Sequence, residues 1–253
     1  MKKLSILILS GVLFTTSCKD NTDKKEETQE TKGEEQVMKA EEQQQEWKML
    51  FNGKNLDHWK AYNSDSISEQ WQVKDGAIVF SPAQGEREGT ENLISKEEFS
   101  SFELSLEWKI SEGGNSGIMW GVQEEDKFDE PYLTGPEIQV LDNEKHPDAK
   151  NGPIRQAGAL YDMVAPKEDV TKPAGEWNKE VIKIDYEANK GTVTLNGTKL
   201  IEFPLHGEEW EKLVANSKFK DWEAFGKSKK GHIALQDHGD KVWYRNIKIK
   251  ELD

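Results

Sequence analysis

From Trp47 onward, apolar residues occur in short runs or alternate with polar ones, and Gly, Asn and Asp separate the runs. Residues 102–110 show the clearest alternation, because every second residue from Phe102 to Ile110 is apolar. On a strand, this pattern buries one face and exposes the other. Short runs of this kind between turn residues predict many β-strands in antiparallel pairing.

Turn residues between the runs predict which strands pair. Residues 71–73 and 77–80 flank a turn that contains Asp75-Gly76, a dipeptide that favours a tight hairpin. The same reasoning predicts a three-strand meander over residues 181–186, 191–195 and 199–203.

Two further patterns lie near the C-terminus. Residues 232–236 and 242–250 flank the polar turn 237–240 and are expected to pair as a closing hairpin. Residues 208–225 break the alternation with apolar residues at helical spacing, which predicts two short helices that meet near Asn216-Ser217. Many strands without a βαβ rhythm predict an all-β fold, a β-sandwich or jelly roll, with a short helical insertion near residues 208–225.

The N-terminus has the pattern of a bacterial secretion signal. Lys2 and Lys3 precede an apolar stretch that is too short to span a bilayer as a mature helix. Cys18 is the single cysteine of the chain and follows Thr15-Thr16-Ser17 in an arrangement that resembles a lipobox. Residues 1–18 are therefore expected to be a lipoprotein signal peptide that is cleaved before a lipidated Cys18.

The segment after this cysteine differs in composition from the rest of the chain. Residues 19–46 contain no aromatic residue and are rich in Glu, Lys and Gln, which predicts a disordered acidic tether. The whole chain has a formal net charge of -14, and this argues against a nucleic-acid partner. We expect an exported lipoprotein anchored to the outer membrane, periplasmic or at the cell surface, that touches the membrane through its lipid alone.

Candidate chemistry gathers around residues 137–141. Their alternation places Glu137 and Gln139 on one face of a strand, and the apolar residues between them leave the other face. A sheet that merely faces water can carry the same pair. The preceding Asn115-Ser116-Gly117 turn and Trp120 favour a sugar-binding site instead, because polar groups beside an indole ring suit a sugar.

A series of short motifs resembles a known family. In chain order over residues 50–252 they are LFNGKNLDHW, WQVKDGAIV, NSGIMW, GPEIQVLDN, GALYDM, GEWN, LNG and IALQDHGDKVWYRNIKIKEL. Their set and order resemble the domains, formerly of unknown function, now described as 3-keto-disaccharide hydrolases or 3-keto-glucoside 1,2-lyase/3-keto-2-hydroxy-glucal hydratases. LQDHG and the later RNI are the most specific, and the resemblance covers the predicted domain at residues 47–253.

The resemblance implies a concanavalin A-like jelly roll whose concave sheet holds a small-molecule or oligosaccharide substrate. It implies a substrate already oxidised at C3 by a separate nicotinamide-dependent sugar dehydrogenase. Cleavage would then be a base-catalysed elimination of the C1 substituent, a hydration of the resulting 2-hydroxy-3-keto-glucal, or both. No Gly-rich nucleotide fingerprint follows a predicted strand in this sequence, so we expect that the chain does not oxidise the sugar itself.

Three residues are candidates for proton transfer. Glu137 is the expected base, since a carboxylate on a partly dry surface gains a raised pKa. The alternative is a rim carboxylate held by Arg155 or Lys109. His238 can exchange a proton near neutral pH, and Asp237 can orient a neighbouring side chain. The alternative there is a turn in which Asp237 caps its own backbone and His238 faces water.

Other residues are candidates for holding the substrate. Arg155 and Arg245 could face an enolate oxygen, and Arg245 was expected in a cleft because simple alternation puts it on one face with Ile247 and Ile249. A buried salt bridge would explain Arg245 equally well. The candidates for hydrogen bonds or ring stacking with the sugar are Asn115, Trp120, Gln139, Tyr161 and Gln236.

No metal site or other cofactor is predicted. His146 with Asp142 and Asp148 resembles a metal cluster only loosely, because sequence does not fix ligand spacing in a loop. The question of a divalent metal is left open at this stage.

Two other functions fit the same sequence. A conventional glycoside hydrolase needs two carboxylates, about 5–5.5 Å apart for retention or about 6.5–9.5 Å apart for inversion, and Glu137 with Asp237 or Glu107 could supply them. A non-catalytic carbohydrate-binding module needs only a stacking ring and amides. Turnover of oxidised and unoxidised glycosides separates the three functions.

Overall fold

The computed structural model describes residues 46–85 and 89–252 of the chain. The predicted signal peptide, the lipidation at Cys18 and residues 19–45 of the predicted tether lie outside the described residues, so they stay predictions. Within the described ranges, no helix has both the length and the apolar character needed to cross a lipid bilayer.

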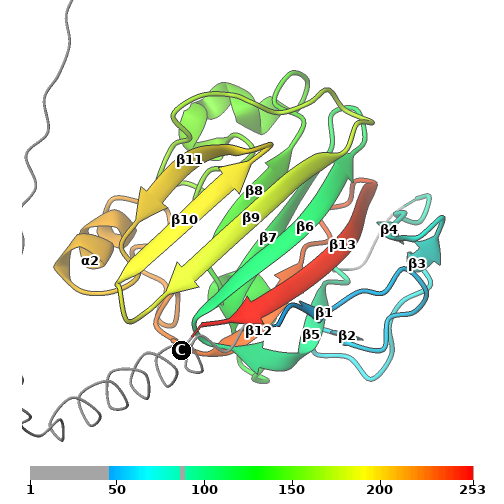
Figure 1. Cartoon of the computed structure of the whole chain (residues 1–253), viewed down its shortest axis with the longest axis horizontal. Coiled ribbons are helices and arrows are strands. Elements are labelled where there is room, and N and C mark those ends of the chain that lie inside the picture. The colour runs from blue at the N-terminus through cyan, green and yellow to red at the C-terminus, as the bar shows by residue number, and fades with distance from the viewer. Residues whose placement is uncertain (1–45, 86–88, 253) are drawn as a thin grey trace, which may run out of the picture. The chain divides into compact units, whose positions relative to one another are not determined.

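Two antiparallel sheets form the two layers of a concanavalin-like jelly-roll sandwich (Figure 1). The larger sheet has the order β11 (Thr198–Phe203), β10 (Lys190–Leu195), β9 (Asn178–Asp185), β6 (Phe102–Ile110), β13 (Val242–Glu251), β4 (Ala77–Phe80) and β3 (Trp71–Lys74), with β1 (Lys48–Met49) paired to β13. The smaller sheet has the order β2 (Trp59–Ala61), β5 (Leu93–Phe99), β12 (Gly231–Leu235), β7 (Asn115–Val122) and β8 (Glu137–Leu141). The predicted all-β sandwich is confirmed.

The alternating stripe on β6 supplies part of the core between the sheets. Its five apolar side chains, from Phe102 to Ile110, are each at most 2% exposed, as the sequence pattern predicts. They belong to one hydrophobic cluster with Ile138 and Val140 of the smaller sheet. Burial of each large apolar side chain contributes about 1.5–3 kcal/mol, so this cluster is the main force that holds the two layers together.

The predicted hairpin and meander are present. β3 pairs with β4 through Asp75 and Gly76, whose φ angles of 51° and 73° give the left-handed turn that matches strand twist. β9, β10 and β11 pair in succession, and Asn196-Gly197 makes the second turn in the same way, with φ angles of 50° and 87°.

The expected closing hairpin is wrong. β12 pairs with β5 and β7 in the smaller sheet, whereas β13 pairs with β6 and β4 in the larger one. Residues 236–241 therefore cross from one layer to the other. A polar turn indicates that the chain reverses direction, but it does not determine which strands pair. Packing in the core determines the partners, and for this reason the local pattern gave a wrong prediction. The crossing puts the residues after β12 at an end of the sandwich.

The insertion after β11 contains one helix, not two. α2 spans Glu208–Ala215, and the following residues up to 225 form turns. The apolar spacing there reflects a cluster of rings, because Phe219 and Phe225 stack with centroids 4.0 Å apart and Trp222 meets Phe219 edge-on. Three short 3-10 helices complete the fold at Pro131–Leu133 (η1), Pro147–Asn151 (η2) and Pro153–Arg155 (η3).

Candidate active site

The pairing of β7 with β8 forms the floor of the site. Ile138 and Val140 are 0% exposed and pack into the core, whereas Glu137 and Gln139 leave the opposite face of β8. Gln139 lies opposite Gly117 of β7 in the register. The alternation seen in the sequence is thus confirmed, and both polar side chains enter one pocket.

This pocket has a volume of about 350 Å³, within the range of small-ligand sites. Three adjacent strands of the smaller sheet, or the loops that follow them, supply most of its walls, and the segment after α2 supplies the rest. Its lining residues are Asn115, Tyr132, Glu137, Gln139, Tyr161, Lys218, Phe219, Trp222, Gln236 and His238. Glu137 and His238, far apart in the sequence, therefore share one cavity.

The Glu137 carboxyl group is held in a dry, closely fitted position. The residue is 8% exposed, and burial raises the pKa of its carboxyl group to about 8, with Lys218 opposing the shift and Asp148 adding to it. The carboxyl group lies across Gly117, where an added Cβ would come within 2.1 Å of Glu137 Oε1. Among the described residues it accepts no hydrogen bond, and neither Arg155 nor Lys109 pairs with it.

Three amide side chains in the pocket have unused hydrogen-bonding capacity. Asn115 Oδ1, Gln139 Oε1 and Gln236 Oε1 are buried and have no hydrogen-bond partner within the described part of the chain. Buried polar atoms are nearly always paired in folded proteins. All three residues line one cavity. Three amide side chains with unused hydrogen-bonding capacity around one cavity indicate a ligand with several polar groups, which a sugar provides.

The turn after β12 contains two candidate residues, Asp237 and His238, which have different roles. Asp237 is 1% exposed, does not line the pocket, and accepts hydrogen bonds from the backbone N–H groups of Glu91 at 2.8 Å and Gly239 at 2.9 Å. Asp237 therefore does not exchange a proton with the substrate, whereas its expected role of orienting a neighbouring side chain fits this position. It caps its own turn, as the alternative reading of the sequence allowed, and thereby holds His238 at the pocket.

His238 combines solvent access with a partly dry position. Partial burial lowers the pKa of its ring below the ordinary value; Asp240 opposes this shift and His146 adds to it. The His146 and His238 rings meet edge to face with centroids 6.3 Å apart. A lowered pKa favours the neutral ring at neutral pH. The neutral ring can accept a proton, and the imidazolium that results can give one.

Lys218 is a functional residue that the sequence reasoning missed. It lines the pocket, and its Nζ lies 4.3 Å from the centroid of the Tyr161 ring. Burial lowers the pKa of its ammonium group, while the charge of Glu137 opposes that shift. Its backbone N–H donates to Asp162 Oδ2 at 2.8 Å, which fixes this segment against the GALYDM motif. An acid and a cation thus influence each other across the pocket.

Three aromatic side chains that line the pocket, those of Tyr132, Phe219 and Trp222, were also not predicted from the sequence. Tyr132 and Trp222 lie with ring centroids 5.8 Å apart, and Phe219 meets Trp222 at 5.0 Å. Rings of this kind suit the apolar faces of a sugar or of its leaving group. The helical spacing of residues 208–225 concealed them, because the segment folds back as turns over the smaller sheet and no periodic pattern signals that geometry.

Tyr161 and Arg155 have different roles from one another. Tyr161 lines the pocket, as predicted, and its hydroxyl donates to Asp148 Oδ2 at 2.7 Å. Arg155 is not among the lining residues; it pairs with Asp148 at 3.1 Å and Asp162 at 2.8 Å. The expectation that Arg155 faces an enolate is corrected, since both loop carboxylates occupy its guanidinium.

Trp120 does not reach the pocket. It is 3% exposed and packs against Phe203 inside the sandwich, with ring centroids 5.9 Å apart. A sugar cannot stack on it there, so that expectation is corrected. Asn115, on the same strand, lines the pocket without the indole ring.

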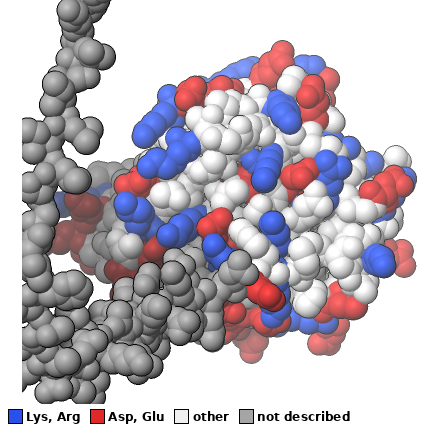
Figure 2. Space-filling view, in the orientation of Figure 1, with Lys and Arg blue, Asp and Glu red and all other residues white. Residues whose placement is uncertain are grey.

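Arg245 lies on the outer face of the larger sheet, the mixed-charge surface that Figure 2 shows. It pairs with Glu107 at 2.7 Å and stacks over Trp177 at 4.0 Å. Arg245 is outside the pocket that contains Glu137, so its expected place facing an enolate oxygen is wrong. The cause is a bulge in β13, where Asn246 adopts a φ of 52° and the register shifts. The bulge lets Tyr244 and Ile247 both point inward, so Arg245 points outward.

The described residues contain no group of three or more His, Cys, Asp or Glu side chains placed to hold a metal ion. His146 accepts a hydrogen bond from the backbone of Asp148, and Asp142 accepts from backbone N–H groups of its own loop and of Gly113. These side chains stabilise loops.

Glu137 is the single carboxylate among the pocket-lining residues that the structure describes. Glu107 is on the other sheet and paired to Arg245, while Asp237 is buried in its turn. Neither pair foreseen for a conventional glycosidase is therefore assembled. The arrangement fits proton abstraction beside a cation better than displacement between two acids.

The fold and the pocket define a β-sandwich protein of the carbohydrate-active class, with a buried acid, free amides and aromatic walls on its smaller sheet. The family model for the 3-keto-alpha-glucoside-1,2-lyase-like domain matches residues 46–250. The chain belongs to this family.

Individual relatives agree with this assignment. A 3-keto-disaccharide hydrolase of Bacteroides thetaiotaomicron is 40% identical over 230 residues, which cover 81% of this chain and 78% of that protein. A crystal structure of a candidate glycosyl hydrolase from Parabacteroides distasonis is 32% identical, with a TM-score of 0.76, and covers 83% of this chain and 95% of its own. A second such structure from that organism is 30% identical, with a TM-score of 0.61, and covers 82% and 100%.

Proposed function

We propose that the protein is a hydrolase of 3-keto-glycosides, either 3-keto-glucosides or 3-keto-disaccharides, acting by elimination and hydration. The observation that carries this proposal is the buried Glu137 carboxylate, the one acid among the described lining residues, with its pKa raised to about 8 and a cation, Lys218, in the same pocket. Membership of the family and the activity named for the Bacteroides relative support the choice of substrate.

The chemistry begins at the carbon next to the ketone. A carbonyl at C3 acidifies the hydrogen on C2, so Glu137 takes that proton and the electron pair moves onto the C3 oxygen as an enolate. The enolate then re-forms the ketone, a C1–C2 double bond appears, and the bond from C1 to the leaving oxygen breaks. Water adds to C1 and a proton returns to C2 in the second half, which gives net hydrolysis.

Each step has a residue suited to it. Lys218, whose ammonium has a lowered pKa, stabilises the negative charge that develops on the C3 oxygen. In its protonated form, His238 gives a proton to the departing C1 oxygen, and the neutral ring that results later draws one from the attacking water. Asn115, Gln139 and Gln236 bind the sugar hydroxyls through their unpaired groups. Glu137 is the one residue in this scheme that takes the proton from C2.

The purified protein is tested with a 3-keto-glucoside in deuterium oxide, with the product followed by NMR. We expect deuterium at C2 of the released sugar, above the level without enzyme, and no turnover of the unoxidised glucoside. Glu137→Gln and His238→Ala should each lower the rate by at least about a hundredfold, the range for a proton-transfer group. Glu112→Gln, which removes an exposed carboxylate, is the matched control.

Other results would select the other functions. Turnover without label at C2 would mean direct hydrolysis. Cleavage of the unoxidised glucoside would indicate a conventional glycosidase, and binding of both sugars without turnover would indicate a carbohydrate-binding module. Normal rates in both variants would remove Glu137 and His238 from the mechanism.

We also propose that the substrate comes from a separate sugar 3-dehydrogenase and that the chain is an exported lipoprotein. The support for export is the apolar stretch before Cys18, the single cysteine. Cells that express the full chain and are fed radiolabelled palmitate should incorporate label into the protein, and Cys18→Ser should abolish it. Equal labelling of both forms would contradict lipidation at Cys18.

A further inference from the structure

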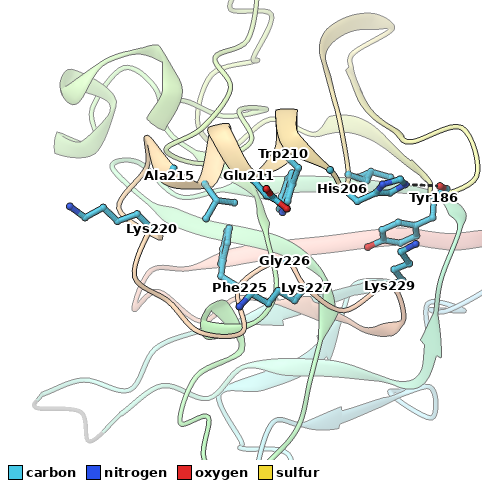
Figure 3. Close-up of a pocket in the computed structure, with 13 residues that line it drawn as sticks. Tyr186, His206, Trp210, Glu211, Ala215, Lys220, Phe225, Gly226, Lys227 and Lys229 are labelled. Atoms are coloured by element: carbon cyan, nitrogen blue, oxygen red, sulfur yellow. Dashed lines mark hydrogen bonds between the residues drawn. The ribbon is translucent and has the colours of Figure 1, made fainter.

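A second cavity of about 390 Å³ lies behind the segment that walls the candidate active site. It is bounded by α2 on one side and by the loop at residues 225–229 on the other (Figure 3). None of its lining residues belongs to the pocket that contains Glu137. The proposed reaction therefore makes no use of it.

The walls of this cavity are aromatic and aliphatic. Trp210 and Phe225 present parallel rings, with planes within 6° and centroids 6.4 Å apart. Tyr186 closes another side, and its hydroxyl donates to the carbonyl of Ser228 at 3.2 Å. Leu205 and Val214 complete the apolar lining. A flat ring can extend such a stack of rings.

Positive charge surrounds these walls. Lys220, Lys227 and Lys229 line the cavity, against one acid, Glu211. Within the described ranges, neither Lys227 nor Lys229 has a carboxylate partner within ion-pair distance, in a chain whose net charge is -14. Unpaired cations beside an apolar hollow are complementary to a ligand that has both a ring and a negative charge.

We propose that this cavity is a second binding site, for a small planar aromatic carboxylate. The ring packs against Trp210 and Phe225. Lys227 and Lys229 approach the cavity from different ends (Figure 3), and the ammonium group that the carboxylate faces donates a hydrogen bond to it. Phe225 also stacks on Phe219, which lines the candidate active site. The bound ring therefore lies behind the aromatic wall that the substrate meets.

The full chain is titrated with 2-naphthoate, and binding is followed by tryptophan fluorescence and saturation-transfer NMR. We expect saturable binding, weakened about tenfold or more when Lys227 and Lys229 are both changed to Gln, because a hydrogen bond to a charged group is lost. Glu211→Gln should strengthen binding, since it removes the opposing charge. Lys230→Gln, an exposed neighbour outside the lining, should leave it unchanged.

Two controls separate this site from the active site. Glu137→Gln should bind 2-naphthoate as the unchanged protein does, whether or not the proposed reaction is correct. The neutral 2-naphthamide should bind at least about tenfold more weakly than 2-naphthoate, because it lacks the charge. Absence of saturable binding, equal binding of the amide, or tighter binding by the lysine variant would overturn the proposal.

Discussion

Glu137 must lose a proton before it can act as a base, and its surroundings resist that loss. Burial raises the pKa of its carboxyl group to about 8, and the ammonium group of Lys218 acts in the opposite direction. The burial of Lys218 lowers the pKa of its own ammonium. Each group therefore stabilises the charged form of the other in a partly dry pocket. The interaction between the two residues, more than either residue alone, sets the pH at which the enzyme becomes active.

The pH dependence of the reaction tests this pairing. With a 3-keto-glucoside, kcat/KM should rise with pH through about 8, as Glu137 ionises. Lys218→Met removes the cation that favours the carboxylate, so the rise should move to higher pH and the maximum rate should fall. Lys230→Gln controls for loss of a surface charge. A rise that moves to lower pH in the Met variant would contradict the pairing.

Single residues were predictable where a regular strand carried them. Glu137 and Gln139 followed from alternation, since the face of a strand is fixed by parity. Arg245 was misplaced because one bulged residue, Asn246, reverses that parity. In the structure, Tyr244 and Ile247 are both buried in the core, although regular alternation would place them on opposite faces. Lys218 lies in irregular turns, where no period links sequence to direction.

At the scale of elements, the site depends on how closely β7 and β8 approach. Gly117 has no side chain, and the Glu137 carboxyl group occupies the space where one would be. Residues 115–117 were expected to form a turn but are the first three residues of β7. They contribute the Asn115 amide and, at Gly117, the space that the Glu137 carboxyl group fills. The sequence correctly indicated that residues 115–117 belong to the site. Gly117 contributes for a steric reason, because its missing side chain leaves room for the Glu137 carboxyl group.

Gly117→Ala tests this steric role. The added methyl group would meet Glu137 Oε1 at 2.1 Å, so the carboxyl group must move and kcat should fall by about tenfold or more, as for a misplaced catalytic group. The thermal unfolding midpoint reports whether the fold survives. In a Glu137→Gln background the same change should add little further loss, because the two act as a unit. Additive losses would mean that Gly117 acts elsewhere.

The elements themselves were predictable in unequal measure. Hairpins with Asp-Gly or Asn-Gly turns came out correctly, because the turn geometry is local. The segment at residues 236–241 did not, since the choice between pairing and crossing is made by distant strands. The second helix expected after Asn216 is replaced by turns. Turns let Phe219 and Phe225 stack with centroids 4.0 Å apart, whereas residues six positions apart in a helix are separated by about 9 Å along the axis.

For the whole molecule, a second buried acid affects stability. Glu180 on β9 is 0% exposed; its Oε2 accepts from Trp108 Nε1 at 2.6 Å, and its Oε1 has no partner among the described residues. Burial raises the pKa of this carboxyl group to about 8. The sandwich therefore keeps a proton at neutral pH that the unfolded chain releases.

The stability of the protein should consequently fall as pH rises. Unfolded Glu loses its proton near pH 4.3, while folded Glu180 keeps it up to about 8. The free energy of unfolding should decrease over that interval by up to about 1.4 kcal/mol per pH unit for this group. Urea unfolding at pH 5 and pH 8 measures the decrease, and Glu180→Gln should reduce it. An unchanged pH dependence in Glu180→Gln would show that Glu180 is not responsible.

β12 lies in the middle of the smaller sheet, between β5 and β7, although it follows every other strand of that sheet in the sequence. A nascent chain that ends before Gly231 leaves the facing edges of β5 and β7 unpaired, and such edges template wrong pairing with other chains. Prolonged delay or premature termination of synthesis before Gly231 would thus give aggregation in place of a smaller folded product.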